Sequence, residues 1–272
     1  MSAALVASTM LLILEFVSLE AVPGLEAIGL KRMFTDASWH PAEDAARGRF
    51  NIGPMIVGTL AASLGAVALA APIGVASAVF SCFYAPAALA RWHRRLVELL
   101  AGVPSVVFGF WGLVVLTPLI RQLAPPGQSL LAAILVLALM ILPTIALLAE
   151  AALRAVPTSY LRGASALGVS RAGMVWGIAV PAARSGLVTA VVLATGRAIG
   201  ETMAVLMVAG NIVQLPSSLF DPARMLTANI ALELGYAAGD HRAALFVTGF
   251  VLLAMTMLLV AMAASLTRGR NP

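Results

Sequence analysis

Charged side chains are scarce in this sequence. Only 11% of its 272 residues are Asp, Glu, Lys or Arg, whereas 61% are hydrophobic. A soluble domain carries about 25% charged residues, so this chain has too few polar groups to cover a surface that faces water. In lipid every backbone N–H and C=O must be paired internally, which leaves only helices or closed barrels. Long apolar blocks, rather than short alternating segments, favour helices. We therefore predict an all-α, polytopic membrane protein.

Several kinds of chemistry lack the residues that they need. The single cysteine, Cys82, excludes an internal disulfide, and His40, His93 and His241 are too far apart in sequence to suggest a metal site. The sequence has no Walker A phosphate-binding loop and no clustered catalytic set. We therefore expect no enzymatic activity and no cofactor in this chain. Its net charge of +5 comes from basic residues between apolar blocks, which indicates contact with the lipid bilayer and its headgroups rather than with nucleic acid.

Apolar blocks of about 20 residues predict about six spans in a single transmembrane domain, residues 1–272. The first helix is expected at 3–22 and the core helices within 52–266, at 52–83, 99–120, 130–148, 187–208 and 243–266. The first block contains Glu15 and Glu20 but no basic start. We therefore interpret it as a span rather than as a signal peptide. An outer loop is expected at 23–51, and further polar loops at 84–98, 150–184 and 211–240.

The distribution of basic residues predicts the orientation. Arginines are frequent in 84–98, in 150–184 and in the tail 267–272, which carries Arg268 and Arg270. Because cytoplasmic loops are enriched in Lys and Arg, we place these segments and the N-terminus in the cytoplasm.

Segment 160–181 has the pattern of a docking loop. It reads Tyr-Leu-Arg-Gly-Ala-Ser-Ala-Leu-Gly and continues into a second helix that ends in an aliphatic residue and a proline. This resembles the EAA loop of ABC importer permeases, which docks into a cleft on the ATPase. The matching positions are Ala164, Ala166, Leu167, Gly168, Ile178 and Pro181.

Local chemistry agrees with that role, although an ordinary amphipathic connector is the alternative. Gly168 permits the positive φ that separates two helices, and Pro181 suits the first turn of a helix. Together with Leu161, the residues Ala164, Ala166 and Leu167 are expected to offer an apolar face to a partner. Arg162 occupies the position where the family has glutamate, so that contact must be replaced or reversed.

Three further stretches narrow the resemblance. They are 51–60, 99–118 and 195–211, the last of which contains Gly-Arg-Ala-Ile-Gly-Glu-Thr-Met-Ala-Val. They resemble PstC-type phosphate permeases, and Trp39-His-Pro matches a loop feature before the first of these stretches. The resemblance covers nearly the whole chain. It implies a MetI-like fold in the bacterial inner membrane and the transmembrane subunit of an ATP-driven phosphate importer. The implied partners are a sister phosphate permease, a dimer of ATP-binding subunits that holds ATP and Mg²⁺, and an extracytoplasmic phosphate-binding protein, which the loop 215–240 is expected to meet.

Two charges lie inside the predicted fifth span. Arg197 and Glu201 are four residues apart and would share one face of a helix. A charge at mid-bilayer costs about 2.5–3.5 kcal/mol and marks function by default, so we assign both, with Thr202, to the translocation path. The alternative is that the two charges only satisfy each other, as a structural salt bridge that locks two subunits together. Gly196 and Gly200 would let a neighbouring helix approach closely. Asn211, beyond this span, is either a gate residue or, as we favour, an outer helix cap.

Two other functions are alternatives to phosphate import by an ABC permease. A permease for another oxyanion, such as sulfate, molybdate or phosphonate, would share the docking loop but not the stretch around Arg197. A secondary transporter or channel would not need the docking loop.

Overall fold

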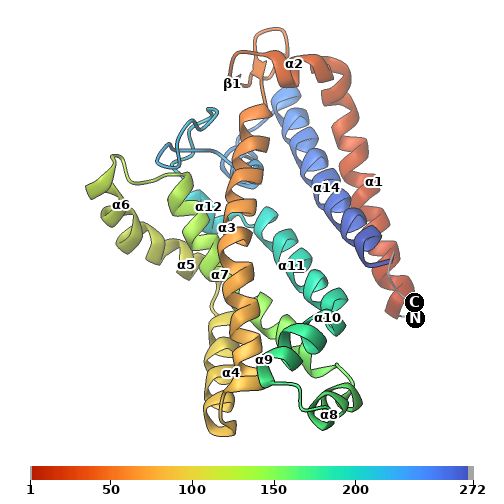
Figure 1. Cartoon of the computed structure of the whole chain (residues 1–272). Helices are drawn as coiled ribbons and strands as arrows, with labels where there is room; N and C mark the ends of the chain where they lie inside the picture. Colours follow the sequence, from red (N-terminus) through yellow and green to blue (C-terminus); the bar gives the residue numbers. More distant parts are fainter. Residues whose placement is uncertain (1, 269–272) are drawn as a thin grey trace.

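The computed structural model describes residues 2–268, most of which are helical (Figure 1). Among these residues five helices are long and apolar enough to cross a membrane: Leu5–Ile28, Gly53–Tyr84, Ser105–Leu123, Leu130–Arg154 and Gly239–Met262. A sixth candidate is the pair Arg171–Ala182 and Arg184–Ile199, which is bent by 67°. The prediction of an all-α membrane protein with about six spans is confirmed. Arg270 of the predicted basic tail lies outside the described residues.

Two long helices form the centre of the fold, α3 (Gly53–Val79) and α7 (Leu130–Arg154). Ala62, Ala66 and Ala70 lie one turn apart on α3, and each is at most 1% exposed. A Cβ atom on Gly74 would lie 2.8 Å from Cγ2 of Ile145. Small residues therefore let the two backbones pack closely, as is usual between helices in lipid.

A second pair of helices lies to one side of this centre. It consists of α1 (Ser2–Ile28) and α14 (Gly239–Arg268), which pack against each other (Figure 1). A Cβ atom on Gly24 would lie 2.8 Å from the backbone of Ala243, and the rings of Phe16 and Phe246 meet edge to face, 5.9 Å apart. Only 6% of the apolar window of α1 is buried, so most of this helix is free to face lipid.

The outer segment 23–51 is more ordered than the predicted loop. Helix α1 continues to Ile28, and α2 (Leu30–Thr35) leads into strands β1 (Trp39–His40) and β2 (Arg49–Phe50), which pair antiparallel. Arg32 donates to the carbonyl oxygens of Ala45 at 2.9 Å and Gly48 at 2.7 Å. The Asp36 carboxylate accepts from the Phe50 amide at 2.9 Å. These bonds to backbone groups order the second half of the segment. We call that half, residues 36–51, the outer hairpin.

The prediction of a basic loop at 84–98 is wrong. After the π-helical end of α3, η1 (Phe80–Tyr84), this segment forms helix α4 (Ala87–Ala101). The third span then begins later than predicted, because Gly102 and Pro104 interrupt the helix. It consists of α5 (Ser105–Trp111), the π-helical η2 (Gly112–Leu116) and α6 (Thr117–Leu123).

Two other predicted boundaries also move. Helix α7 continues beyond residue 148 to Arg154, so Glu150 lies within it and is buried. The predicted loop 211–240 contains a short helix, α13 (Leu226–Glu233). Before α13, the carbonyl oxygens of Leu219 and Asp221 accept hydrogen bonds from the amides of Leu131 and Leu130, at 2.7 and 2.9 Å. These contacts satisfy amides that the start of α7 would otherwise leave unpaired.

Candidate functional site

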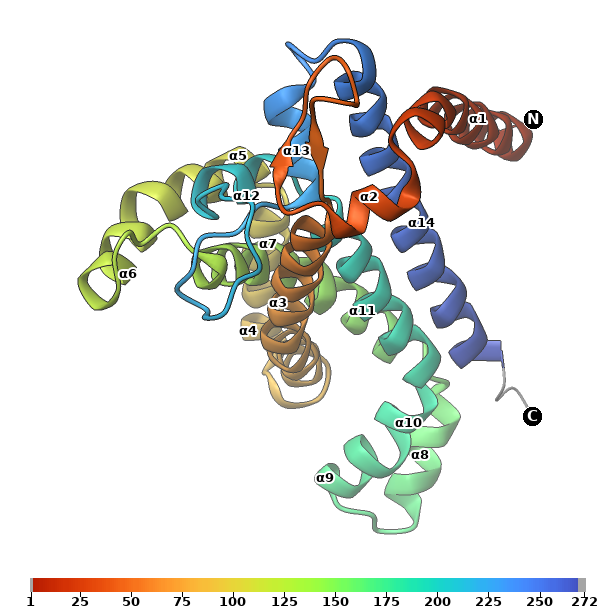
Figure 2. The ribbon, with the colours of Figure 1, turned by 90° about the horizontal axis from the view of Figure 1, so that it is seen from above.

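The predicted docking loop folds into a helical hairpin that projects from the body of the molecule (Figure 2). Its elements are α8 (Thr158–Ala166), α9 (Arg171–Met174), the π-helical η3 (Val175–Ala179) and α10 (Val180–Ala182). Gly168 has φ = 72° between the two arms, and Ser170 caps α9 by accepting from the Gly173 amide at 3.2 Å. Pro181 lies in the first turn of α10. The predicted helix–turn–helix is confirmed, and we call it the docking hairpin.

The exposed face of the docking hairpin differs from the one predicted. Leu167 is 85% exposed, and Arg162 and Ala166 are also exposed. Ala164, in contrast, is 4% exposed, and Leu161 packs against a buried apolar cluster at the end of α7. The prediction that Leu161 and Ala164 face a partner is therefore wrong, because these side chains hold the hairpin to its own chain.

The predicted fifth span is broken. The sequence predicted one helix over 187–208, but the structure has α11 (Arg184–Ile199) and α12 (Met203–Val208), with a break at residues 200–202. The carbonyl oxygen of Glu201 accepts from the Thr227 hydroxyl at 2.7 Å instead of serving a continuous helix. The Glu201 carboxylate accepts from the Ala204 amide at 3.2 Å and so caps the start of α12.

Arg197 and Glu201 consequently do not share a helix face. Arg197 lies exposed in the last turn of α11. Within residues 2–268, no carboxylate lies within ion-pair distance of its guanidinium group. A salt bridge inside this chain therefore does not explain the pair, and the positive charge of Arg197 remains available to a ligand or to a second subunit.

The two glycines beside these charges face open space. A Cβ atom on Gly196 would meet no atom within 4 Å, and one on Gly200 would meet only the carbonyl oxygens of Gly196 at 3.5 Å and Arg197 at 4.0 Å. No other helix among the described residues packs on them, so their close approach to a neighbour stays a prediction about another subunit.

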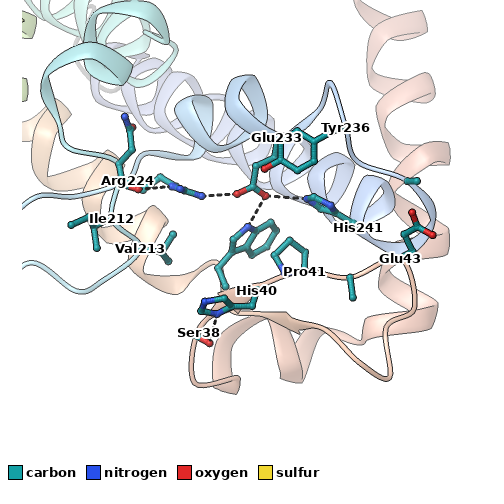
Figure 3. A pocket seen from close by; sticks show the side chains of 14 residues that line it. Ser38, His40, Pro41, Glu43, Ile212, Val213, Arg224, Glu233, Tyr236 and His241 are labelled. Carbon is teal, nitrogen blue, oxygen red and sulfur yellow. Dashed lines mark hydrogen bonds and ion pairs between the residues drawn. The ribbon is translucent and has the colours of Figure 1, made fainter.

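A buried polar cluster lies against the outer hairpin (Figure 3). Its centre is Glu233, the last residue of α13, which is 6% exposed. The Glu233 carboxylate accepts from the Trp39 indole nitrogen at 2.8 Å and pairs with Arg224 at 2.6 Å and with His241 at 3.0 Å. We call these four residues the Glu233 cluster.

The cluster borders a cavity of about 730 Å³ between the outer hairpin, the segment after α12 and the start of α14 (Figure 3). Asn211, with φ = 55°, donates to the carbonyl oxygen of Leu206 at 2.7 Å. The favoured interpretation of Asn211 as a helix cap is therefore confirmed. Arg224 donates to the carbonyl oxygen of Asn211 at 2.9 Å, so the Glu233 cluster also contacts the backbone beyond α12.

The sequence alone did not reveal this cluster. Glu233 and Trp39 are 194 residues apart, and no local spacing predicts that they meet. The one signal was the Trp39-His-Pro feature, which resembles a loop feature of PstC-type permeases. Within residues 2–268, no group of three or more His, Cys, Asp or Glu side chains is placed to hold a metal ion.

A broken span, with a helical hairpin at one end of the molecule and a cavity at the other, is an arrangement found in membrane transport proteins. The chain belongs to the family described as binding-protein-dependent transport system inner membrane component, whose model matches residues 70–271. It is therefore an ABC importer permease, a multi-pass protein of the bacterial inner membrane.

Curated relatives are similar over most of the chain. The probable ABC transporter permease protein YqgH of Bacillus subtilis (strain 168) is 38% identical, over 100% of this chain and 87% of the relative. The phosphate transport system permease protein PstC of Xylella fastidiosa (strain 9a5c) is 34% identical, over 88% of this chain and 80% of the relative. PstC of Mycobacterium leprae (strain TN) is 31% identical, over 94% and 86%. The predicted resemblance to PstC-type permeases is confirmed.

Solved structures confirm the fold. The inward-facing MetNI methionine ABC transporter aligns with a TM-score of 0.63 at 22% identity, over 81% of this chain and 94% of that chain. A bacterial ABC transporter involved in the import of alginate aligns with a TM-score of 0.62 at 14% identity, over 80% and 79%.

Proposed function

We propose that this chain is the transmembrane subunit of an ATP-driven phosphate importer. The observation that carries the proposal is the similarity to several permeases named for phosphate transport, at 31–34% identity over most of the chain. The partners are a sister permease, a dimer of ATP-binding subunits and an extracytoplasmic phosphate-binding protein.

The docking hairpin is the proposed contact with the ATPase. Leu167 and Ala166 are exposed at its tip, and the positive φ of Gly168 sets the angle between its two arms. An exposed apolar side chain on a short helix can enter a groove of a partner. ATP and Mg²⁺ are held by that partner, and its movement reaches this chain through α8 and the end of α7.

The break at 200–202 is the proposed place where this chain meets phosphate. Transporters often bind ions at broken helices, where helix ends and unpaired backbone groups face a path. Arg197 supplies the positive potential that an anion needs on leaving water. Glu201 lies close by in the chain and limits how tightly the anion is held, so that it can be released. Thr202 adds a hydroxyl group at the break.

Uptake measurements test this proposal. Deletion of the gene should abolish high-affinity phosphate uptake and leave sulfate uptake unchanged, and a plasmid copy should restore it. Unchanged phosphate uptake together with loss of sulfate uptake would contradict the phosphate assignment and leave the chain as a permease for another oxyanion.

A further inference from the structure

Helix α13 lies between the outer hairpin and the broken span and is bonded at both ends (Figure 2). With eight residues it is about 12 Å long at 1.5 Å per residue. A helix of this length moves as one piece, so a displacement at one end is carried to the other.

The first turn of α13 is fixed to the break. The Thr227 hydroxyl donates to the carbonyl oxygen of Glu201 at 2.7 Å, and Thr227 is 6% exposed. The Leu226 amide donates to the Thr59 hydroxyl of α3 at 3.0 Å. A Cβ atom on Gly58 would lie 2.8 Å from the Arg224 carbonyl oxygen, so α3 leaves no free space here.

The last turn of α13 is fixed to the outer hairpin through Glu233. One carboxylate oxygen binds Arg224, and the other binds both Trp39 and His241. Arg224 in turn donates to the carbonyl oxygen of Asn211. A buried carboxylate that loses a partner carries a large desolvation cost, so Glu233 holds these groups together.

Hydrogen bonds therefore connect Glu233 to both ends of α12. Its start is reached through α13 and the bond from Thr227 to Glu201, and its end is reached through Arg224 and Asn211. We propose that Glu233 is a positioning residue that ties the outer hairpin to the break in the fifth span, with α13 as the rigid link. A protein that docks on the outer hairpin then changes the break without touching it. That consequence rests on the proposed function, whereas the mechanical link does not.

Hydrogen–deuterium exchange in the assembled transporter tests the link without any substrate. Trp39→Phe removes the indole N–H and keeps an aromatic ring. We expect amide exchange within 199–206 to become about threefold to tenfold faster, the change expected for loss of one hydrogen bond. Thr248→Val is the matched control, because that buried hydroxyl bonds only to Ala244 within α14, at 3.0 Å. It should leave 199–206 unchanged.

A second variant cuts the link at its other end. Thr227→Val should speed exchange directly within 199–203, at the break and the start of α12. Adding Trp39→Phe should then have no further effect on those amides, because the route through Arg224 and Asn211 reaches only the end of α12. Two outcomes would overturn the proposal: faster exchange in Trp39→Phe confined to 36–51, or additive effects of the two substitutions within 199–203. Glu233→Gln should act like Trp39→Phe, and if that variant fails to assemble, Trp39→Phe still decides the result. Phosphate uptake by the unaltered transporter is measured separately, so failure of the proposed function is distinguishable from failure of the link.

Discussion

Arg197 lies in the last turn of α11, and Glu201 lies directly before α12. The end of a helix carries a partial negative charge and its start a partial positive charge. Each ionised side chain is therefore stabilised by its own helix end, and neither needs the other as a partner. This arrangement leaves the guanidinium group of Arg197 exposed and free to attract an anion.

Arg197→Gln should lower the initial rate of phosphate uptake about tenfold or more, because a tenfold rate change corresponds to about 1.4 kcal/mol and the whole charge is lost. Arg197→Lys should keep part of the rate, since its charge remains. Arg121→Gln, at an exposed arginine of α6, is the control and should transport normally. Normal uptake in Arg197→Gln, at equal amounts of assembled transporter, would remove Arg197 from the path.

Substitution of two glycines in the docking hairpin can distinguish backbone strain from steric clash. A Cβ atom on Gly163 or on Gly168 would meet no atom within 4 Å, but only Gly168 has a positive φ. Gly168→Ala should therefore destabilise the hairpin by about 1 kcal/mol, and Gly163→Ala, within α8, should not. Hydrogen exchange over 158–182 measures both. Equal protection in the two variants would show that the turn does not depend on Gly168.

At the scale of the element, α4 depends on one buried carboxylate. Glu150 of α7 is 4% exposed and pairs with Arg154 at 2.8 Å and with Arg94 of α4 at 3.5 Å. Arg94 also pairs with Glu98 at 2.8 Å. The bond to Glu98, followed by the charge of Glu150, raises the pKa of Arg94. The cation is therefore retained, and it holds α4 against α7.

Glu150→Gln should loosen α4 by about 1–2 kcal/mol, because a charged hydrogen bond becomes a neutral one at a half-exposed arginine. We expect faster amide exchange over 87–101 and an unchanged exchange rate in α3. Glu98→Gln, which alters only the exposed pair on α4, is the control and should have a smaller effect. An equal effect of the two substitutions would show that the buried carboxylate has no special role.

The sequence predicted some elements well and others not at all, for physical reasons. Long apolar blocks predicted α3, α7 and α14, because lipid requires such runs. Helix α4 was missed because its arginines resemble loop charges, although charges do not end a helix. The break at 200–202 was missed because it depends on a residue far away in sequence. The hydroxyl group of Thr227 donates a hydrogen bond to the carbonyl oxygen of Glu201. Arg197, Glu201 and Thr202 of the proposed translocation path were nevertheless selected from the sequence, and their role stays a prediction.

At the scale of the whole molecule, the two surfaces proposed to bind partners lie at opposite ends (Figure 1). The outer hairpin and the Glu233 cluster lie at one end, and the docking hairpin lies at the other. The start of α1 points toward the end that carries the docking hairpin. This agrees with an N-terminus in the cytoplasm, and it separates the surface proposed for an outer binding protein from the surface proposed for the ATPase.

Cysteine labelling checks this orientation in a Cys82→Ser background. The Arg47 side chain is 86% exposed in the outer hairpin, and Ser165 is exposed on α8. Arg47→Cys should react with a membrane-impermeant maleimide in intact cells (outer membrane permeabilised where there is one), and Ser165→Cys only after the inner membrane is opened. The reverse pattern would show that the chain is inserted the other way round.

The pairing of α1 with α14 has a consequence for biogenesis. Helix α1 contacts the helix farthest from it in sequence, so this contact cannot form until the intervening spans have entered the membrane. During synthesis α1 therefore lies in lipid with Gly24, which contacts Ala243 of α14 in the folded chain, still uncovered. Its small, apolar surface keeps the free-energy cost of this exposure low. A chain that stops before α14 leaves this helix permanently without its neighbour, which is a feature that membrane quality control can recognise.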